Sequence, residues 1–224
     1  MWPTVRLVRE LFHGELARLG AELVGAVRLA ATQLRHAMSA LLQVDLRLAE
    51  RVITDDDEVH WLGRRIERHA GELLVLQAPV ASDLRSVVCA IRIGERLERM
   101  GDLARHVAEI ARLRHPRPAV PAGLVDQFTE MGRLAVRACL ELEDVIVAPY
   151  LSWREQARAD DRIDRLQAEV LDQVRTANPP YPVQAGVDVA LLARYLERFG
   201  DQTVAITAQL DYVATGAMPN RPTR

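Results

Sequence analysis

The segment ERMGD at residues 98–102 recurs as ERFGD at residues 197–201, in the second half of a 224-residue chain. The two segments differ only where Met100 is replaced by Phe199. Apolar residues around both segments recur at intervals of three or four, the spacing that places side chains on one face of an α-helix. The repeat therefore predicts two equivalent helices, one in each half, that carry the same acidic motif.

Prolines mark the ends of these helices, because proline interrupts a helix that would otherwise continue. The chain between them lacks the alternation of apolar and polar residues that is typical of strands. Asp45 is suited to cap a helix start, and a further break is allowed at residues 54–57. The predicted helices span residues 5–42, 46–77, 83–114, 122–148, 152–177 and 186–215, with the second open to a split near Thr54.

Short connections between long amphipathic helices favour antiparallel neighbours. The fold class is therefore predicted as all-α, a six-helix bundle built from two repeated three-helix bundles. The first repeat is assigned to residues 1–115 and the second to residues 122–216. A linker at 116–121 joins them, and the tail at 217–224 is expected to fray. The basic residues around this linker, Arg112, Arg114, His115 and Arg117, are interpreted as a solvated loop rather than an anion-binding cluster.

Composition excludes several functional classes. Hydrophobic residues make up 49% of the chain and aromatic residues only 4%, which indicates a sizeable core without a stacking platform for nucleic-acid bases. All 29 basic residues are arginine, so no lysine is present for a Schiff base or a P-loop. The net charge of -2 provides no overall field that would attract nucleic acid.

The two cysteines and the hydropathy of the chain indicate where in the cell the protein is expected. Cys89 and Cys139 form no CxxC motif and lie among apolar residues, so buried free thiols are expected. No apolar run approaches the roughly 18 residues that a membrane span needs. The chain is therefore expected to be soluble and cytoplasmic, and to meet membranes only through its partners.

Each half also carries a second pair of potential ligands, one helix before the motif. The two members of each pair are four residues apart and so share a helix face. Each pair lies about as many residues before its proline turn, at 79 or at 179–180, as the acidic motif residues lie after it. A helical hairpin therefore brings the pair and the motif acids to the same level along the helix axis. The predicted groups are Asp56, His60, Glu98 and Asp102 in the first half and Asp160, Asp164, Glu197 and Asp201 in the second.

Such groups repel one another at close range unless a cation lies between them. Carboxylate oxygens suit a divalent ion such as iron, manganese or magnesium, and the absence of cysteine ligands argues against a structural zinc. The alternative is a pair of solvated helix faces, on which Arg99 pairs with Glu95 and Arg105 pairs with Asp102. The duplication and the matched heights favour the metal site.

Glycine occupies the same place in both motifs, at Gly101 and Gly200. Each glycine costs its helix about 1 kcal/mol relative to alanine. A close approach by a ligand or by a neighbouring helix is therefore expected at both positions.

The segment after Pro79 allows two interpretations. Ser82 is expected to cap the following helix, with Asp83 in its first turn. The alternative is a partner-binding role for Asp83 and Arg85.

These motifs, together with LQAPVASDLR at 76–85 and AERVITDDDEV at 49–59, resemble the PhoU family of phosphate-uptake regulators. The resemblance extends from FHGEL at 12–16 to the end of the sixth helix. It implies a cytoplasmic, dimerising protein of two three-helix repeats that negatively regulates the phosphate-starvation response. Its implied partners are the ATPase subunit of the phosphate ABC transporter and a phosphate-sensor histidine kinase.

The resemblance also implies multinuclear metal clusters on paired E/DxxxD motifs. Glu98, Asp102, Glu197 and Asp201 match the metal motif, and Asp160 and Asp164 match its partner in the second half. The first half departs from the family pattern, since His60 stands where Asp or Asn is usual and Gly63 where Glu is usual. Ala168 likewise replaces a usual Glu. The second-half site is therefore the stronger prediction.

Three functions compete on this basis. The first is a non-enzymatic adaptor in phosphate signalling. The second is a ferritin-like di-iron oxidase, which needs Glu-x-x-His motifs on two helices, whereas only Glu10 and His13 have that spacing. The third is a dimerising scaffold without metal. The remaining histidines, including His69, are expected to be surface or satisfied residues.

Overall fold

The computed structural model describes residues 3–147, 153–176 and 181–217, and within these ranges the regular structure is entirely helical. The predicted six helices are present, and the second is split in two. The elements are α1 (Pro3–Gln43), α2 (Leu46–Thr54), α3 (Asp56–Gln77), α4 (Ala81–Arg114), the short 3-10 helix η1 (Ala122–Leu124), α5 (Val125–Val147), α6 (Trp153–Val174) and α7 (Val183–Thr215).

The break between α1 and α3 follows from local hydrogen bonding. Asp45 caps α2 as predicted, because its Oδ1 accepts from the Leu48 backbone N–H at 3.0 Å. α2 ends at Thr54, where the predicted break begins, and the Asp55 N–H bonds back to the Arg51 carbonyl. α3 then begins at Asp56 with three acidic residues in its first turn, which suits the positive end of the helix dipole.

The prediction for Ser82 is wrong. α4 begins at Ala81, and Val80, in extended conformation, takes the capping position without a side-chain hydrogen bond. Ser82 therefore lies inside the first turn, where its carbonyl accepts from the Ser86 hydroxyl at 3.1 Å. Asp83 lies in the first turn, as predicted.

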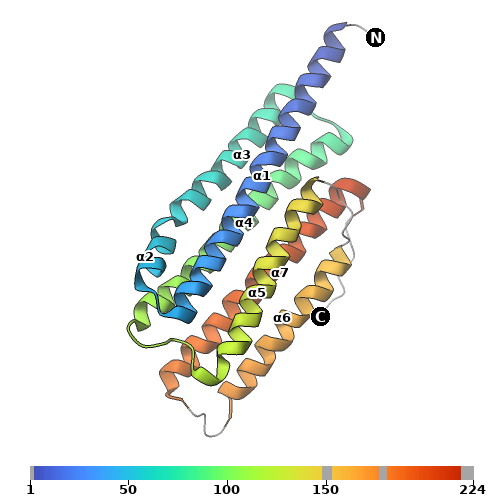
Figure 1. The fold of residues 1–224 in the computed structure, drawn as a ribbon. Coiled ribbons are helices and arrows are strands. Elements are labelled where there is room, and N and C mark those ends of the chain that lie inside the picture. Colours follow the sequence, from blue (N-terminus) through green and yellow to red (C-terminus); the bar gives the residue numbers. More distant parts are fainter. Residues whose placement is uncertain (1–2, 148–152, 177–180, 218–224) are drawn as a thin grey trace.

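The helices form two three-helix repeats packed side by side (Figure 1). α1, α3 and α4 correspond to α5, α6 and α7. α1 packs against α5 and α4 packs against α7, so these two contacts form the seam between the repeats. α3 and α6 lie on opposite outer sides of the molecule (Figure 1). Each motif helix, α4 or α7, therefore faces its own partner helix on one side and the other motif helix at the seam.

One continuous apolar core runs through both repeats. Met100 and Phe199, the residues that differ between the two motifs, are fully buried in it. Cys89 and Cys139 are buried free thiols, as expected, and burial raises the pKa of both. The core thus joins the two halves rather than forming one centre in each.

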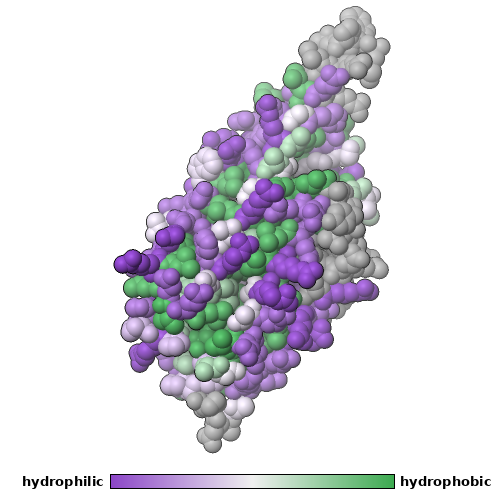
Figure 2. Space-filling view, in the orientation of Figure 1, coloured by the Kyte–Doolittle hydropathy of each residue, from purple (hydrophilic) through white to green (hydrophobic). Residues whose placement is uncertain are grey.

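The surface mixes apolar and charged side chains (Figure 2). The α1–α5 side of the seam carries a groove of about 530 Å³, with Met38, Val136 and Leu140 among apolar residues and Arg35 and Arg133 among charged ones. None of the described helices is both long enough and apolar enough to cross a lipid bilayer.

Candidate metal centre

The helical hairpins have the register that the proline turns predict. A Cβ atom on Gly101 of α4 would lie 2.8 Å from Val59 Cγ1 of α3. A Cβ atom on Gly200 of α7 would lie 2.3 Å from Asp160 Oδ1 of α6. Both motif glycines therefore permit a close approach, but to an apolar side chain in the first repeat and to a carboxylate in the second.

In the first repeat, three of the four predicted ligands come together. His60 Nε2 lies 3.4 Å from Asp56 Oδ2 and 3.5 Å from Asp102 Oδ1. Within the described ranges, this is the only set of three or more His, Cys, Asp or Glu residues with ligand atoms all within 4.8 Å of one another. All three side chains are half-buried.

Glu98, the fourth predicted ligand of this repeat, lies against Gly63. A Cβ atom at Gly63 would come within 2.3 Å of Glu98 Oε1, so the glycine provides the room that the Glu98 side chain occupies. Burial raises the pKa of Glu98, while His60 and Arg64 oppose that shift. Gly63 therefore supplies no ligand of its own, and its small size fixes where the Glu98 carboxylate lies.

Arg105 already supplies a positive charge to this group. Its Nε lies 2.9 Å from Asp56 Oδ2, its Nη2 lies 3.1 Å from Asp102 Oδ1, and its Nη1 donates to Glu109 at 2.6 Å. The pairing with Asp102, which belonged to the solvated-face alternative, is present, and the contact with Asp56 extends it across to α3. The guanidinium contacts the same two oxygen atoms that face His60. A metal ion could use them only by displacing Arg105, so the first repeat does not fit a metal as it stands.

The second repeat has a different arrangement of charge. Asp160 and Glu197 are buried, at 3% and 5% exposure, while Asp164 and Asp201 are half-buried. Burial raises the pKa of Glu197, and the negative charges of Asp201 and Asp164 raise it further. Arg194 opposes the shift, and its Nη1 donates to Glu197 Oε2 at 2.6 Å. Burial of Glu197 and repulsion by the neighbouring carboxylates thus both disfavour the ionised state of Glu197.

The two repeats differ at the position three residues after the motif aspartate. The first repeat has Arg105 there, and the second has the buried Val204. The second repeat thus has no arginine at this position of its sequence, and Arg194 contacts Glu197 instead. The four acidic side chains of α6 and α7 offer oxygen donors of the kind that iron, manganese or magnesium takes. By donor type, these residues suit a metal ion better than those of the first repeat, where Arg105 contacts two of the candidate ligand oxygens.

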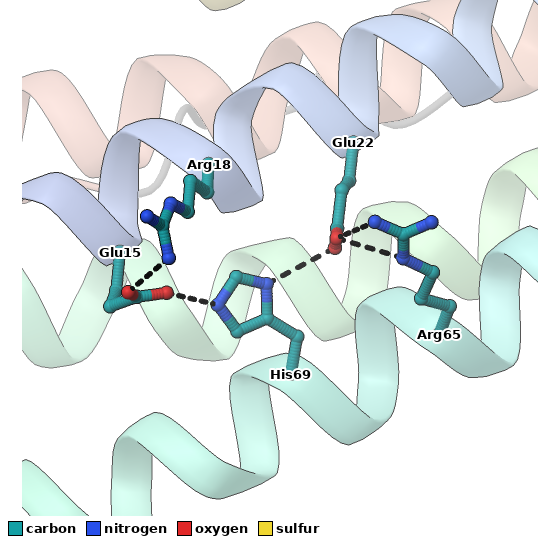
Figure 3. Close-up of polar contacts among 5 residues, drawn as sticks. All are labelled: Glu15, Arg18, Glu22, Arg65 and His69. Carbon is teal, nitrogen blue, oxygen red and sulfur yellow. Dashed lines mark hydrogen bonds and ion pairs between the residues drawn. The ribbon is translucent and has the colours of Figure 1, made fainter.

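A further polar cluster joins α1 to α3 (Figure 3). His69 lies between two carboxylates of α1, with Nε2 3.2 Å from Glu15 Oε2 and Nδ1 3.1 Å from Glu22 Oε2. Each carboxylate also has an arginine, Arg18 on Glu15 and Arg65 on Glu22. His69 was expected to be a surface or satisfied histidine, and its two carboxylate partners were not predicted. The seven-residue spacing of the two glutamates, which places them on one face of α1, was the available signal.

The residues predicted to bind a partner lie far from the metal motif. Asp83 is about 28 Å from Asp102 along α4, at 1.5 Å per residue. Arg85 lies against the end of α7, with its Cζ 6.0 Å from the centre of the Tyr212 ring. Arg85 thus has a contact within the chain, and the partner role of both residues stays a prediction.

Arg114 does not lie in a solvated loop. It is the last residue of α4, and its guanidinium donates to both carboxylate oxygens of the buried Asp188 on α7, at 2.5 and 2.9 Å. This pair is a polar link across the seam between α4 and α7. The pairing of Arg99 with Glu95, also part of the solvated-face alternative, is absent among the described side chains.

Comparison with known proteins gives matches over nearly the whole chain. The family model described as the PhoU domain matches twice, over residues 24–111 and 128–209. A Mycobacterium tuberculosis protein called phosphate-specific transport system accessory protein PhoU homolog 2 is 40% identical over 213 residues, covering 95% of this chain and 100% of its own. The PhoU homolog 1 of Mycobacterium leprae is 38% identical over 217 residues, covering 96% of this chain and 98% of its own.

Solved structures show the same architecture. The crystal structure of the phosphate transport system regulatory protein PhoU from Streptococcus pneumoniae matches with a TM-score of 0.81 at 26% identity, covering 94% of this chain and 100% of that chain. PhoU from Pseudomonas aeruginosa matches with a TM-score of 0.82 at 26% identity, covering 92% and 100%.

Proposed function

Because the chain belongs to the PhoU family, we propose that it is an accessory protein of phosphate transport that negatively regulates the phosphate-starvation response. In this proposal it is a cytoplasmic, homodimeric adaptor between the ATPase subunit of the phosphate ABC transporter and a phosphate-sensor histidine kinase, and it is not an enzyme. The observation that carries the proposal is the match of both repeats to the family, with relatives named as accessory proteins covered over almost their whole length.

The proposal includes a divalent metal ion, one or several, on the second repeat. Asp160, Asp164, Glu197 and Asp201 would hold it, and the burial of Asp160 and Glu197 together with the valine at position 204 supports this choice. The ion would neutralise carboxylates that otherwise repel one another, and would hold α6 against α7. Asp56, His60, Glu98 and Asp102 would form the corresponding site of the first repeat only if Arg105 moved away.

The regulatory role is tested in cells. Deletion of the gene, together with any second PhoU-family gene, should raise expression of phosphate-uptake genes in phosphate-replete medium. Restoring this gene alone should lower expression again. If expression is unchanged in the deletion strain, or if restoring the gene has no effect, the chain does not have this role.

The metal is tested on protein purified without chelator. Wild-type protein should contain iron, manganese or magnesium, and the Glu197→Ala/Asp201→Ala variant should contain markedly less. The matched control is Glu169→Ala/Asp172→Ala, which removes two exposed acidic side chains from α6 and should leave the metal content unchanged. Wild-type protein that stays without metal after loading with each ion would favour the metal-free scaffold.

The di-iron oxidase alternative is disfavoured by the place of its motif. Glu10 and His13 are both exposed on α1 and do not point into a buried centre. Ferritin-like sites place such motifs inside the bundle, on two of its helices. Oxygen consumption by protein loaded with Fe²⁺ would revive this alternative.

A further inference from the structure

The α4–α7 side of the seam holds a pocket of about 290 Å³. Arg99 and Arg198, the second residues of the two repeated motifs, both line it. Equivalent positions of the two repeats thus contribute the same side chain to one pocket. The two arginines reach the same pocket because they hold equivalent positions on α4 and α7, which pack against each other.

Both arginines are available to a ligand. Each side chain is exposed, and neither makes a hydrogen bond or ion pair with any residue in the described part of the chain. By contrast, Arg105, Arg114 and Arg194 on the same two helices are all paired with carboxylates. A guanidinium presents five N–H donors in a planar fork that matches carboxylate and phosphate oxygens. Two such groups at one pocket favour an anion.

The other polar groups of the pocket agree with that charge. Gln202 accepts a hydrogen bond from Arg96 through its side-chain oxygen at 3.0 Å, which leaves its amide N–H groups as donors. Asp102 is the acidic residue of the lining, and its Oδ1 lies 3.1 Å from Arg105 Nη2 and 3.5 Å from His60. The lining therefore offers donors from Arg99, Arg198 and Gln202, while its one carboxylate is already countered.

We propose that this pocket binds a tetrahedral oxyanion of the phosphate class, held between Arg99 of the first repeat and Arg198 of the second. The volume is about ten times the roughly 30 Å³ of one water molecule, enough for a small hydrated anion. The inference goes beyond the adaptor role and requires neither that role nor a bound metal.

Isothermal titration calorimetry at about 0.15 M salt tests the proposal, since that ionic strength screens non-specific attraction between exposed charges. Inorganic phosphate should bind to the wild-type protein with one anion per chain. Arg99→Gln and Arg198→Gln should each weaken binding about tenfold or more, since each removes charge-assisted hydrogen bonds, and the double variant should not bind. The matched control, Arg47→Gln/Arg68→Gln, removes two exposed and unpaired arginines elsewhere and should bind as wild type does.

Three comparisons decide between sources of binding. Protein treated with a chelator should bind phosphate equally well, and loss of binding after chelation would assign the anion to a metal and overturn the proposal. The proposal would also be overturned if phosphate binding were weakened equally in the control variant. The same holds if the wild-type protein shows no binding at millimolar phosphate. ATP that binds more tightly than phosphate, and with the same dependence on Arg99 and Arg198, would identify a nucleotide phosphate as the source of the oxyanion.

The test is independent of the fold and of the proposed regulatory function. Both arginines are exposed, so thermal unfolding followed by circular dichroism should show wild-type stability for each single variant. A failed titration leaves the gene-deletion result unaffected, and an unchanged deletion phenotype leaves the titration unaffected.

Discussion

Replacing Gly101 by alanine should destabilise the protein, although alanine is the better helix former. The new Cβ atom would lie 2.8 Å from Val59 Cγ1 and 3.1 Å from Val59 Cβ, closer than carbon atoms pack. Val59 is only 2% exposed and β-branched, so its side chain has one strongly preferred rotamer in a helix and cannot turn away. α3 and α4 must therefore move apart.

The magnitude follows from two opposing effects. Overpacking a rigid site costs about 2–3 kcal/mol, the upper part of the usual range. Alanine returns about 1 kcal/mol through its helix propensity. The net loss is about 1–2 kcal/mol, which for a chain of this length lowers the melting temperature by about 2–8 °C.

Thermal unfolding followed by circular dichroism measures the effect. Gly71→Ala in α3 is the matched control, because nothing lies within 4 Å of the position of its new Cβ atom. This control should gain up to about 1 kcal/mol and melt about 2–4 °C higher than wild type. If Gly101→Ala raises the melting temperature as Gly71→Ala does, the close approach of α3 to α4 is not what requires the glycine.

Four further outcomes are expected. Gly200→Ala, whose Cβ atom would displace the Asp160 carboxylate, should lower the metal content measured by elemental analysis, whereas Gly101→Ala should not. Glu197 has a raised pKa, so the folded state holds its proton more tightly than the unfolded state does. The free energy of unfolding therefore falls as the pH rises from the ordinary glutamate pKa through the raised one. In metal-free protein, Glu197→Gln should make the free energy of unfolding in urea depend less on pH across that interval. Asp188→Asn leaves the Arg114 guanidinium without its carboxylate and should cost about 1–3 kcal/mol in the same urea assay, where a loss below about 0.5 kcal/mol would contradict the link across the seam. His69→Gln should speed amide hydrogen exchange in residues 12–22 of α1 by a few-fold, corresponding to about 1 kcal/mol, and unchanged exchange would show that the Glu15–His69–Glu22 cluster does not hold α1.

Features that depend on the spacing of residues along one helix could be predicted from the sequence. The proline positions gave the turns between antiparallel helices, and the i, i+4 pairs then gave the height at which Asp56, His60 and Asp102 meet. A split near Thr54 was allowed because residues 54–57 can cap a helix, and in the structure α3 begins there with three acidic residues in its first turn. These signals are local in the sequence. The geometry of an antiparallel hairpin then determines which residues of the two helices lie opposite each other.

Features that depend on the reach of a side chain between helices could not be predicted. Arg105 was matched to Asp102 on its own helix, but its contact with Asp56 depends on the distance between α3 and α4. Arg114 appeared to be part of a loop, because the sequence gives no sign that Asp188 would be buried opposite it. Ser82 was misplaced for a local reason, since Val80 adopts the extended conformation of a helix cap without a capping side chain.

The apolar core that crosses the seam makes the two repeats one cooperative unit. Leu34 of α1 and Met100 of α4 belong to the same buried cluster as Phe128 of α5 and Phe199 of α7. Unfolding either repeat alone would expose that cluster on the half that remained, at a cost of about 25 cal/mol for each Å² of apolar surface. Heat should therefore melt the molecule in a single calorimetric transition. A protease cut in the linker should leave two fragments that stay bound to each other through the shared core. The duplicated halves would then behave like the two subunits of a dimer.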